Sequence, residues 1–234
     1  MADIRIDKYL SVALGVSRSE AKILLKSGKI TADGKIISKP ETKVSETAEV
    51  KNSDSVLKYK KYIYILMNKP EGILSASTDK KVKTVVDILP DNMKRAGLFP
   101  VGRLDKNTTG LLIITDDGDF GHKVTSPKSL IEKRYLAELD GEVKEEYISA
   151  FEKGIILADG EKCMSAGLEI LSDNNAVVTI REGKYHQIKR MFGVLGLGVN
   201  KLKRLSIGKL TLPEDLAKGE VIELDDMQIQ KIFA

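Results

Sequence analysis

From about residue 61 onward, the chain consists of short apolar runs of strand length, which are separated by turns that carry Gly or Asp-Gly. Many short strands with only a few helices between them favour a mixed, largely antiparallel sheet over repeated βαβ units. Residues 61–234 are therefore expected to form an α+β domain with helices that flank the sheet. We predict strands at 62–67, 111–115, 135–139, 155–157, 168–171, 176–180 and 221–224, and helices at 84–89, 144–151, 186–195 and 227–233.

Residues 1–60 have a different, helical pattern, and we expect them to form a separate small α/β unit. Apolar residues recur at helical spacing over 4–14. Ser17 and Glu20 form a capping-box pattern at the start of a second helix. An Asp-Gly turn then predicts a hairpin over 29–37. The polar stretch 38–61 is interpreted as the tail of this unit plus a linker.

All of the net charge of +4 lies in residues 1–60. Within the second predicted helix, Arg18, Lys22 and Lys26 recur every four residues, so their side chains form one ridge. Arg5 and Lys8 lie on the preceding predicted helix. We expect these five cations to bind RNA phosphates, although an ordinary solvated helix face carries the same pattern.

A second positive region extends from residue 181 to 209, where eight cations accompany a single acid and the local net charge is +7. In a domain that is otherwise electrically balanced, such a region suits a polyanion lying across it. The alternative is a solvated basic face, which acids at 116–119 or 140–146 compensate in three dimensions.

Composition excludes several classes of protein. A hydrophobic share of 42% can bury a sizeable core, which argues against disorder. The apolar runs are far shorter than the ~20 residues of a membrane helix, and no apolar signal core is present, so we expect a cytoplasmic protein without membrane attachment. Cys163 is the single cysteine, and its spacing from His122 and His186 does not suggest a zinc site, so we expect neither a disulfide nor a metal. No glycine-rich nucleotide cradle is present in the sequence, and we expect no cofactor.

The segment 101–118 places Arg103 and Asp105 two residues apart in a Gly-bounded loop that leads into a buried strand. Such a loop holds polar side chains at the rim of a rigid sheet. Taken alone, the pattern favours a structural interpretation, with Asp105 in an Asx turn or a cap and Arg103 in solvent. Two further segments, 132–138 and 181–192, make a functional interpretation of Arg103 and Asp105 more favourable than the structural one.

Together with Leu-Met-Asn-Lys-Pro-Glu-Gly at 66–72, these three segments resemble the RsuA family of RNA pseudouridine synthases from about residue 62 to the C-terminus. The first 45 residues resemble the S4 RNA-binding module that this family carries in front. The pattern Gly-Arg-Leu-Asp-x-x-Thr-x-Gly is highly specific, and it occurs together with Gly-Lys-Tyr-His-Gln-Ile-Lys-Arg-Met-Phe at 183–192. The sequences of 115–127 and 183–192 are most similar to the branch that modifies small-subunit (16S) ribosomal RNA.

The resemblance implies a cofactor-free isomerisation, in which the uracil of one uridine is detached from its ribose, turned and rejoined through C5. The base must first leave its stack, at a cost of about a few kcal/mol that contacts with the protein return. The resemblance assigns Asp105 as the obligatory carboxylate, which attacks C1′ or C6 or takes the 2′ proton, and the sequence leaves these routes open. Tyr135 matches the tyrosine that packs on the base and whose hydroxyl accepts the C5 proton. Lys189 matches a position that other branches fill with Arg, and it is expected to pair with Asp105.

Six further positions are assigned to substrate binding by the resemblance: Arg103, Ile188, Asn68, Lys69, Lys184 and Arg190. Arg103 matches an arginine that fills the gap left by the flipped nucleotide or grips the neighbouring phosphates. Ile188 matches an apolar residue against the base. Asn68 and Lys69 match the first motif of the family, which mostly supports the active-site loop.

The leading hypothesis is a monomeric pseudouridine synthase that acts on ribosomal RNA or a ribosomal subunit precursor. His186 and Gln187 are interpreted as structural or RNA-facing, and His186 is not expected to be the acid–base group. One alternative keeps the chemistry but moves it to large-subunit (23S) RNA. Another is a non-catalytic RNA-binding protein that assists ribosome assembly. The joint presence of Asp105, Tyr135 and Lys189 argues against the second alternative.

Overall fold

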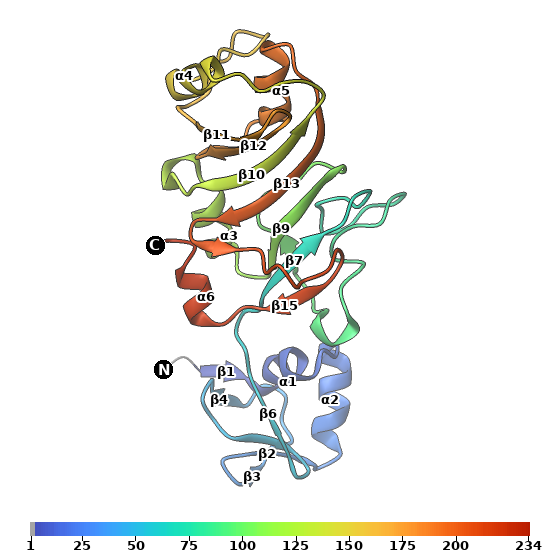
Figure 1. Ribbon diagram of the computed structural model, residues 1–234. Helices are drawn as coiled ribbons and strands as arrows, with labels where there is room; N and C mark the ends of the chain where they lie inside the picture. The colour runs from blue at the N-terminus through green and yellow to red at the C-terminus, as the bar shows by residue number, and fades with distance from the viewer. Residues whose placement is uncertain (1–2) are drawn as a thin grey trace. The chain divides into compact units, whose positions relative to one another are not determined.

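The computed structural model describes residues 3–234, which divide into two compact units (Figure 1). The first unit contains the chain up to Ile63 together with Pro90–Ala96, and the second contains Tyr64–Leu89 and Gly97–Ala234. Within the first unit, the guanidinium of Arg95 donates hydrogen bonds to the carbonyls of Lys60 and Lys61, at 3.0 and 2.7 Å. No helix in the described part of the chain combines the length and the apolar character that crossing a membrane requires.

Two helices pack on small sheets in the first unit. Its elements are β1 (Asp3–Arg5), α1 (Ile6–Leu14), α2 (Arg18–Lys26), β2 (Ile30–Ala32), β3 (Lys35–Ile36), β4 (Lys43–Ser45), β5 (Val50–Asn52), β6 (Ser55–Leu57) and a 3-10 turn at Asp91–Met93. Strand β1 pairs with β4, and the order in the other sheet is β3-β2-β5-β6. The predicted capping box of Ser17 and Glu20 is present at the start of α2. Buried side chains of both helices, such as Leu10 and Leu25, form one core with Ile30 and Val50.

The stretch 38–61, interpreted as the tail of this unit plus a linker, lies within the first unit and contains β4, β5 and β6, so less of it is linker than expected. Each of the three strands has only three residues. Such strands are too short for an alternating pattern to be read above the surrounding charges. Val44 and Val50 are nevertheless buried in the core of the unit, so part of this polar stretch belongs to the fold.

In the second unit, as far as residues 64–234 show, nine strands form one sheet. The strands are β7 (Tyr64–Lys69), β8 (Phe99–Pro100), β9 (Thr108–Thr115), β10 (Lys133–Leu139), β11 (Gly167–Ser172), β12 (Asn175–Ile180), β13 (Val199–Ile207), β14 (Leu210–Thr211) and β15 (Val221–Glu223). The main order is β11-β12-β10-β13-β9-β7-β15 (Figure 1). The β9–β13 pair is parallel and the other pairs are antiparallel, so the prediction of a mixed, mainly antiparallel sheet is confirmed.

Helices flank this sheet: α3 (Gly118–Thr125), a 3-10 turn at Pro127–Ser129, α4 (Glu146–Lys153), α5 (Gln187–Val194) and α6 (Asp226–Gln230). Leu66, Leu111 and Ile113 pack on one face of the sheet with Phe120 of α3 and with Ile232 near the C-terminus. Side chains alternate between the two faces of a strand, so the residues next to these point to the opposite face. That opposite face carries the site described below.

Two sequence predictions differ from the structure of this unit, and four of its α-helices and strands are not among the predictions. The predicted helix at 84–89 is a turn, in which the Thr84 hydroxyl donates to Asp87 at 2.9 Å, because its apolar residues pack from a loop instead of from a helix face. The predicted strand at 155–157 is reduced to a single bridge between Ile156 and Lys162. Strand β13 was not predicted, because a buried arginine and neighbouring lysines hide its alternating pattern. Helix α3 and the short strands β8 and β14 were also not predicted.

Candidate active site

Four strands of the sheet align one row of residues beneath the site. Lys69 pairs with Gly110, Gly110 with Arg204, and Arg204 with Tyr135. Residues paired in this way point to the same face, so three long polar side chains share one surface. Gly110 makes the row possible, because a Cβ there would lie 2.3 Å from the Arg204 carbonyl oxygen, and its φ of +100° is unfavourable for other residues.

A pocket lies over this face, where the loop after β8 and the start of α5 meet the sheet. Asp105 is at its rim with a side chain that is 30% exposed, and it is the only acidic residue among those that line the pocket in the described structure. The lining residues are Arg103, Leu104, Asp105, Thr108, Tyr135, Ile180, Gly183, Lys184, His186, Gln187, Ile188 and Leu202. The sequence-predicted residues Asp105, Tyr135, Arg103, Ile188 and Lys184 are thus brought together.

Lys69, at the end of strand β7, binds the backbone of the loop that carries Asp105. Its fully buried ammonium lies 3.0–3.3 Å from the carbonyl oxygens of Pro70, Asp105, Lys106 and Thr108. Burial lowers the pKa of Lys69 to about 8, and the nearby charge of Asp105 opposes this shift. The ammonium form donates more hydrogen bonds to these carbonyls than the neutral amine does and attracts them more strongly, so the charge of Lys69 stabilises the backbone of the loop.

Asn68 is buried on the face of the sheet that points away from the pocket, where its amide donates to the carbonyl of Leu216 at 2.8 Å. The side chains of Asn68 and Lys69 are 4% and 0% exposed, so neither has surface available to touch RNA. Their assignment to substrate binding is therefore replaced by the supporting role that the first motif implies.

Arg204 contacts the candidate catalytic tyrosine and was missed as a site residue. It is 3% exposed, its Nε donates to the Leu111 carbonyl at 2.7 Å, and one Nη donates to the Tyr135 hydroxyl at 3.3 Å. The guanidinium carbon lies 5.9 Å from the centre of the Tyr135 ring. The sequence showed Arg204 only as one of eight clustered cations, and an alternating reading of 199–207 is the signal that separates it from them.

His186 faces Asp105, which the sequence interpretation did not anticipate. Its Nε2 lies 3.4 Å from Oδ1 of Asp105, so the imidazole is the side chain that stands beside the carboxylate. A φ of +48° at His186 turns the chain just before α5 begins. The ring is also stacked on Tyr185, with a centroid distance of 3.9 Å.

Lys189 does not form the predicted ion pair with Asp105 in the described part of the chain, and it does not line the pocket. The neighbouring Ile188 is 3% exposed and does line the pocket. Successive residues of a helix point in directions about 100° apart, so a helix that turns Ile188 inward turns Lys189 away. His186 occupies the place beside Asp105 that the sequence assigned to Lys189.

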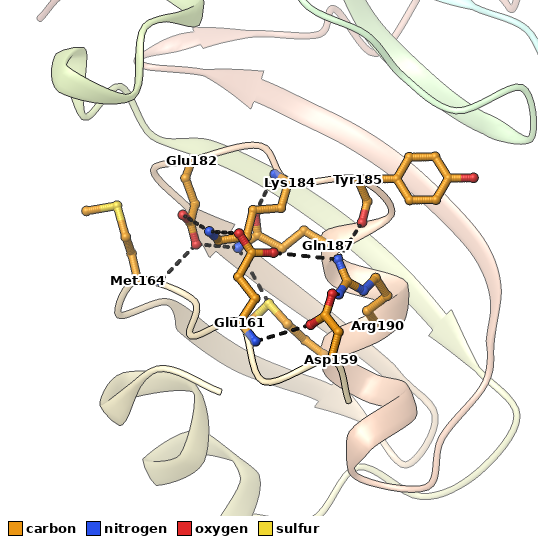
Figure 2. Close-up of polar contacts among 9 residues, drawn as sticks. Asp159, Glu161, Met164, Glu182, Lys184, Tyr185, Gln187 and Arg190 are labelled. Atoms are coloured by element: carbon orange, nitrogen blue, oxygen red, sulfur yellow. Dashed lines mark hydrogen bonds and ion pairs between the residues drawn. The ribbon is translucent and has the colours of Figure 1, made fainter. Parts of the chain in front are cut away.

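Acids neutralise much of the positive region at 181–209 (Figure 2). Lys184 forms ion pairs with Glu161 at 2.6 Å and with Glu182 at 3.5 Å, and the hydrogen bond that its ammonium donates to Glu161 raises the pKa of Lys184. Arg190 pairs with Asp159 and, at 3.8 Å, with Glu161. Arg181 and Lys201 also have acidic partners, Glu132 and Glu138. The compensating acids therefore come from other segments than the predicted 116–119 and 140–146.

The cations of the first unit are more accessible. Arg18, Lys22 and Lys26 are exposed along α2, and Lys8 is exposed on α1. Arg5 differs from these four, because it lies in β1 and binds Asp7 through two hydrogen bonds at 2.8 and 3.1 Å. A phosphate at Arg5 would have to compete with that carboxylate.

Comparisons with known proteins agree with this geometry. Residues 63–193 match the family described as RNA pseudouridylate synthase, and residues 4–50 match the S4 domain. A Vibrio cholerae protein named ribosomal small subunit pseudouridine synthase A is 40% identical over 98% of this chain and 100% of its own length. A Bacillus subtilis protein named an uncharacterized RNA pseudouridine synthase is also 40% identical, over 97% of each chain. A solved structure described as a pseudouridylate synthase matches with a TM-score of 0.68 and 36% identity, and the match covers 98% of this chain and 99% of the other.

Proposed function

Since the chain belongs to the RsuA-like RNA pseudouridine synthases that carry an N-terminal S4 domain, we propose that it isomerises one specific uridine of small-subunit ribosomal RNA. The chain is an isomerase, and the RNA target is the proposed step. The names of several relatives support it, including a Haemophilus influenzae small-subunit enzyme that is 37% identical over 98% of this chain. We further propose that the protein works as a monomer in the cytoplasm on ribosomal RNA or a subunit precursor.

One observation carries the chemical proposal: Asp105 is the only carboxylate among the described residues that line the pocket. The reaction breaks the bond between C1′ and N1 of the uracil and forms a bond between C1′ and C5. The C5 proton then leaves, and N1 gains a proton, so atoms and charge balance without a co-reactant. Asp105 starts this sequence by attacking C1′ or C6, or by removing the 2′ proton.

The neighbours of Asp105 support complementary roles in this mechanism. His186, with Nε2 at 3.4 Å from Oδ1 of Asp105, orients the carboxylate. The Tyr135 hydroxyl is positioned by Arg204, and in the last step its oxygen accepts the C5 proton while its own proton passes on toward N1. Ile188 provides an apolar surface in the pocket, and the exposed Arg103 lies at its edge, where it meets the RNA backbone or the gap left by the flipped base.

The test is pseudouridine mapping of ribosomal RNA treated with the wild-type protein and with Asp105→Asn. We expect one modified site with the wild type and none with the variant, because an amide is a poor nucleophile and a poor base. Asp215→Asn, which changes an exposed carboxylate outside the pocket, is the matched control and should retain activity. Unchanged product with Asp105→Asn would refute the assignment of this carboxylate.

Isolated small- and large-subunit RNA, supplied separately, distinguish the proposed target from its alternative. Product only on large-subunit RNA would move the chemistry to that subunit and refute the proposed target. A salt-dependent RNA affinity is expected of an enzyme and of a passive binder alike, so turnover is the decisive measurement.

A further inference from the structure

The geometry points to a binding site for a second nucleobase beside the pocket, which the ring of Tyr185 forms together with His186. The base of a nucleotide next to the target uridine stacks on this two-ring platform. The inference deepens the proposed function and rests on it, since it requires that the chain acts on an RNA strand. It adds a subsite whose ligand is a flat, unpaired base.

The two rings form a face-to-face stack that begins at the pocket and leaves the outer face of Tyr185 for a third ring. Their centroids are 3.9 Å apart and their planes differ by 19°, which is a stacked arrangement. His186 lines the pocket and lies beside Asp105, whereas Tyr185 is 69% exposed and does not line the pocket. Tyr185 therefore adds a second layer to the stack that starts at His186 beside the reacting carboxylate, and the base stacks on the exposed face of Tyr185.

The contacts of Arg190 fix the backbone of Tyr185 and do not involve its ring (Figure 2). Arg190 donates to the Tyr185 carbonyl at 3.3 Å, and the same guanidinium is held by Asp159 and Glu161. Figure 2 shows the Tyr185 ring directed away from these charged groups. A ring on a fixed backbone loses little freedom when a ligand stacks on it, so the platform is preorganised.

Base flipping creates the need for such a platform. When the target uridine leaves the strand, each neighbouring base loses a stacking partner. An aromatic side chain can replace that partner for any base, because every base has a π-face. The stacked pair of Tyr185 and His186 is connected to the pocket, so it lies where the strand continues from the flipped nucleotide.

The experiment compares Tyr185→Ala, Tyr185→Phe and the wild type for affinity to the small-subunit RNA. Ile156→Ala is the matched control, because it removes an apolar side chain that is 60% exposed and lies outside the pocket. We expect Tyr185→Ala to raise the dissociation constant by about tenfold to a hundredfold, the usual range for loss of one base–aromatic stack. Tyr185→Phe keeps the ring and should stay within roughly threefold of the wild type, since stacking does not need the hydroxyl.

Ultraviolet crosslinking of the wild-type complex gives a readout that a merely structural tyrosine would not provide. The crosslinked peptide should contain Tyr185. Melting temperatures of all variants are measured alongside, so that loss of folding is not taken for loss of stacking.

The proposal is overturned if Tyr185→Ala binds as tightly as Ile156→Ala, or if Tyr185→Phe loses as much affinity as Tyr185→Ala. Wild-type turnover on the same RNA separates this outcome from failure of the proposed function. Absence of wild-type product contradicts the proposed target, whereas product together with unchanged affinity of Tyr185→Ala overturns only the platform.

Discussion

At the scale of single residues, Lys69 connects the protonation of a buried amine to the position of the catalytic loop. An ammonium donates three hydrogen bonds, and four carbonyls lie within reach of this one. A neutral amine donates only two and attracts the carbonyls less. Asp105 belongs to the same loop, so the loop position depends on the charge of Lys69.

We therefore predict that the wild-type rate falls as pH rises through about 8, where the pKa of buried Lys69 lies. Lys69→Met keeps much of the bulk and should lower the rate roughly 10- to 100-fold, the cost of a misplaced catalytic group, without this alkaline step. Single-turnover rates between pH 6 and pH 10 check both expectations. An identical alkaline step in Lys69→Met would exclude Lys69 as its origin.

The lowered pKa of Lys69 makes the stability of the fold rise with pH, whereas the reaction rate falls. The unfolded chain keeps the Lys69 proton up to the ordinary value of 10.5, whereas the folded chain releases it near 8. Between these values the unfolded state binds more protons, so the contribution of Lys69 to the free energy of unfolding increases with pH. Burial also lowers the pKa of Lys133 to about 8, so the pH slope of wild type minus Lys69→Met is needed to isolate Lys69.

Arg204 acts on the reaction through Tyr135, which makes it a positioning residue. A lysine at this place carries one point charge and cannot bond both the Leu111 carbonyl and the Tyr135 hydroxyl in the fixed geometry of a guanidinium. We predict that Arg204→Lys lowers the single-turnover rate by about tenfold while RNA affinity stays close to that of the wild type.

A double-mutant cycle with Tyr135→Phe checks that this loss passes through the tyrosine. If Arg204 positions the hydroxyl, the two losses are not additive, because Tyr135→Phe has already removed the group that Arg204 holds. Fully additive losses would show that the effect of Arg204 is separate from Tyr135.

At the scale of elements, helix α2 carries its cations along one exposed face. Arg18, Lys22 and Lys26 recur every four residues, and the structure leaves all three exposed. We predict that Lys22→Glu with Lys26→Glu weakens RNA binding and makes the plot of log affinity against log salt shallower by about 1 to 2. Equal affinity at low salt would count against the ridge.

The control for this prediction is Lys35→Glu with Lys58→Glu, which makes the same charge change at two exposed lysines outside α2. The melting temperature should change little in either double variant, because exposed charges contribute little to stability. The product formed at saturating RNA should likewise be retained.

The sequence predicts some elements well and others poorly, for physical reasons that particular residues show. Helix α2 was predictable because Ser17 and Glu20 mark its start chemically. The turn at 84–89 was not, since Val85 and Leu89 are buried at a spacing that a helix and a packed loop share. Strand β13 was hidden because one of its inward positions carries Arg204 in place of an apolar residue.

The residues of the candidate site likewise fall into those that local sequence reveals and those that it does not. The loop of Asp105 and the strand of Tyr135 were recognisable from local sequence, and the structure places both at one pocket. The contacts of Arg204 and Lys69 depend on strand register between segments far apart in the chain, which local patterns do not contain. The expected pairing of Lys189 differed because a positive φ at His186 sets which residues of α5 face inward.

At the scale of the whole molecule, charge is distributed differently from what the sequence suggested. The first unit keeps exposed cations, whereas Lys184, Arg190, Arg181 and Lys201 in the second unit have acidic partners. We therefore expect the exposed cations of the first unit to contribute to the salt dependence of RNA affinity.

The segment Pro90–Ala96 has a consequence for how such a protein evolves. It belongs to the first unit although the second unit begins at Tyr64, so the two units are interleaved along the gene. A single recombination at residue 63 would transfer an S4 unit without the segment that carries Arg95 and its hydrogen bonds to Lys60 and Lys61. An exchange of residues 1–63 alone would therefore lose these hydrogen bonds, and a chimera keeps them only when Pro90–Ala96 is transferred as well.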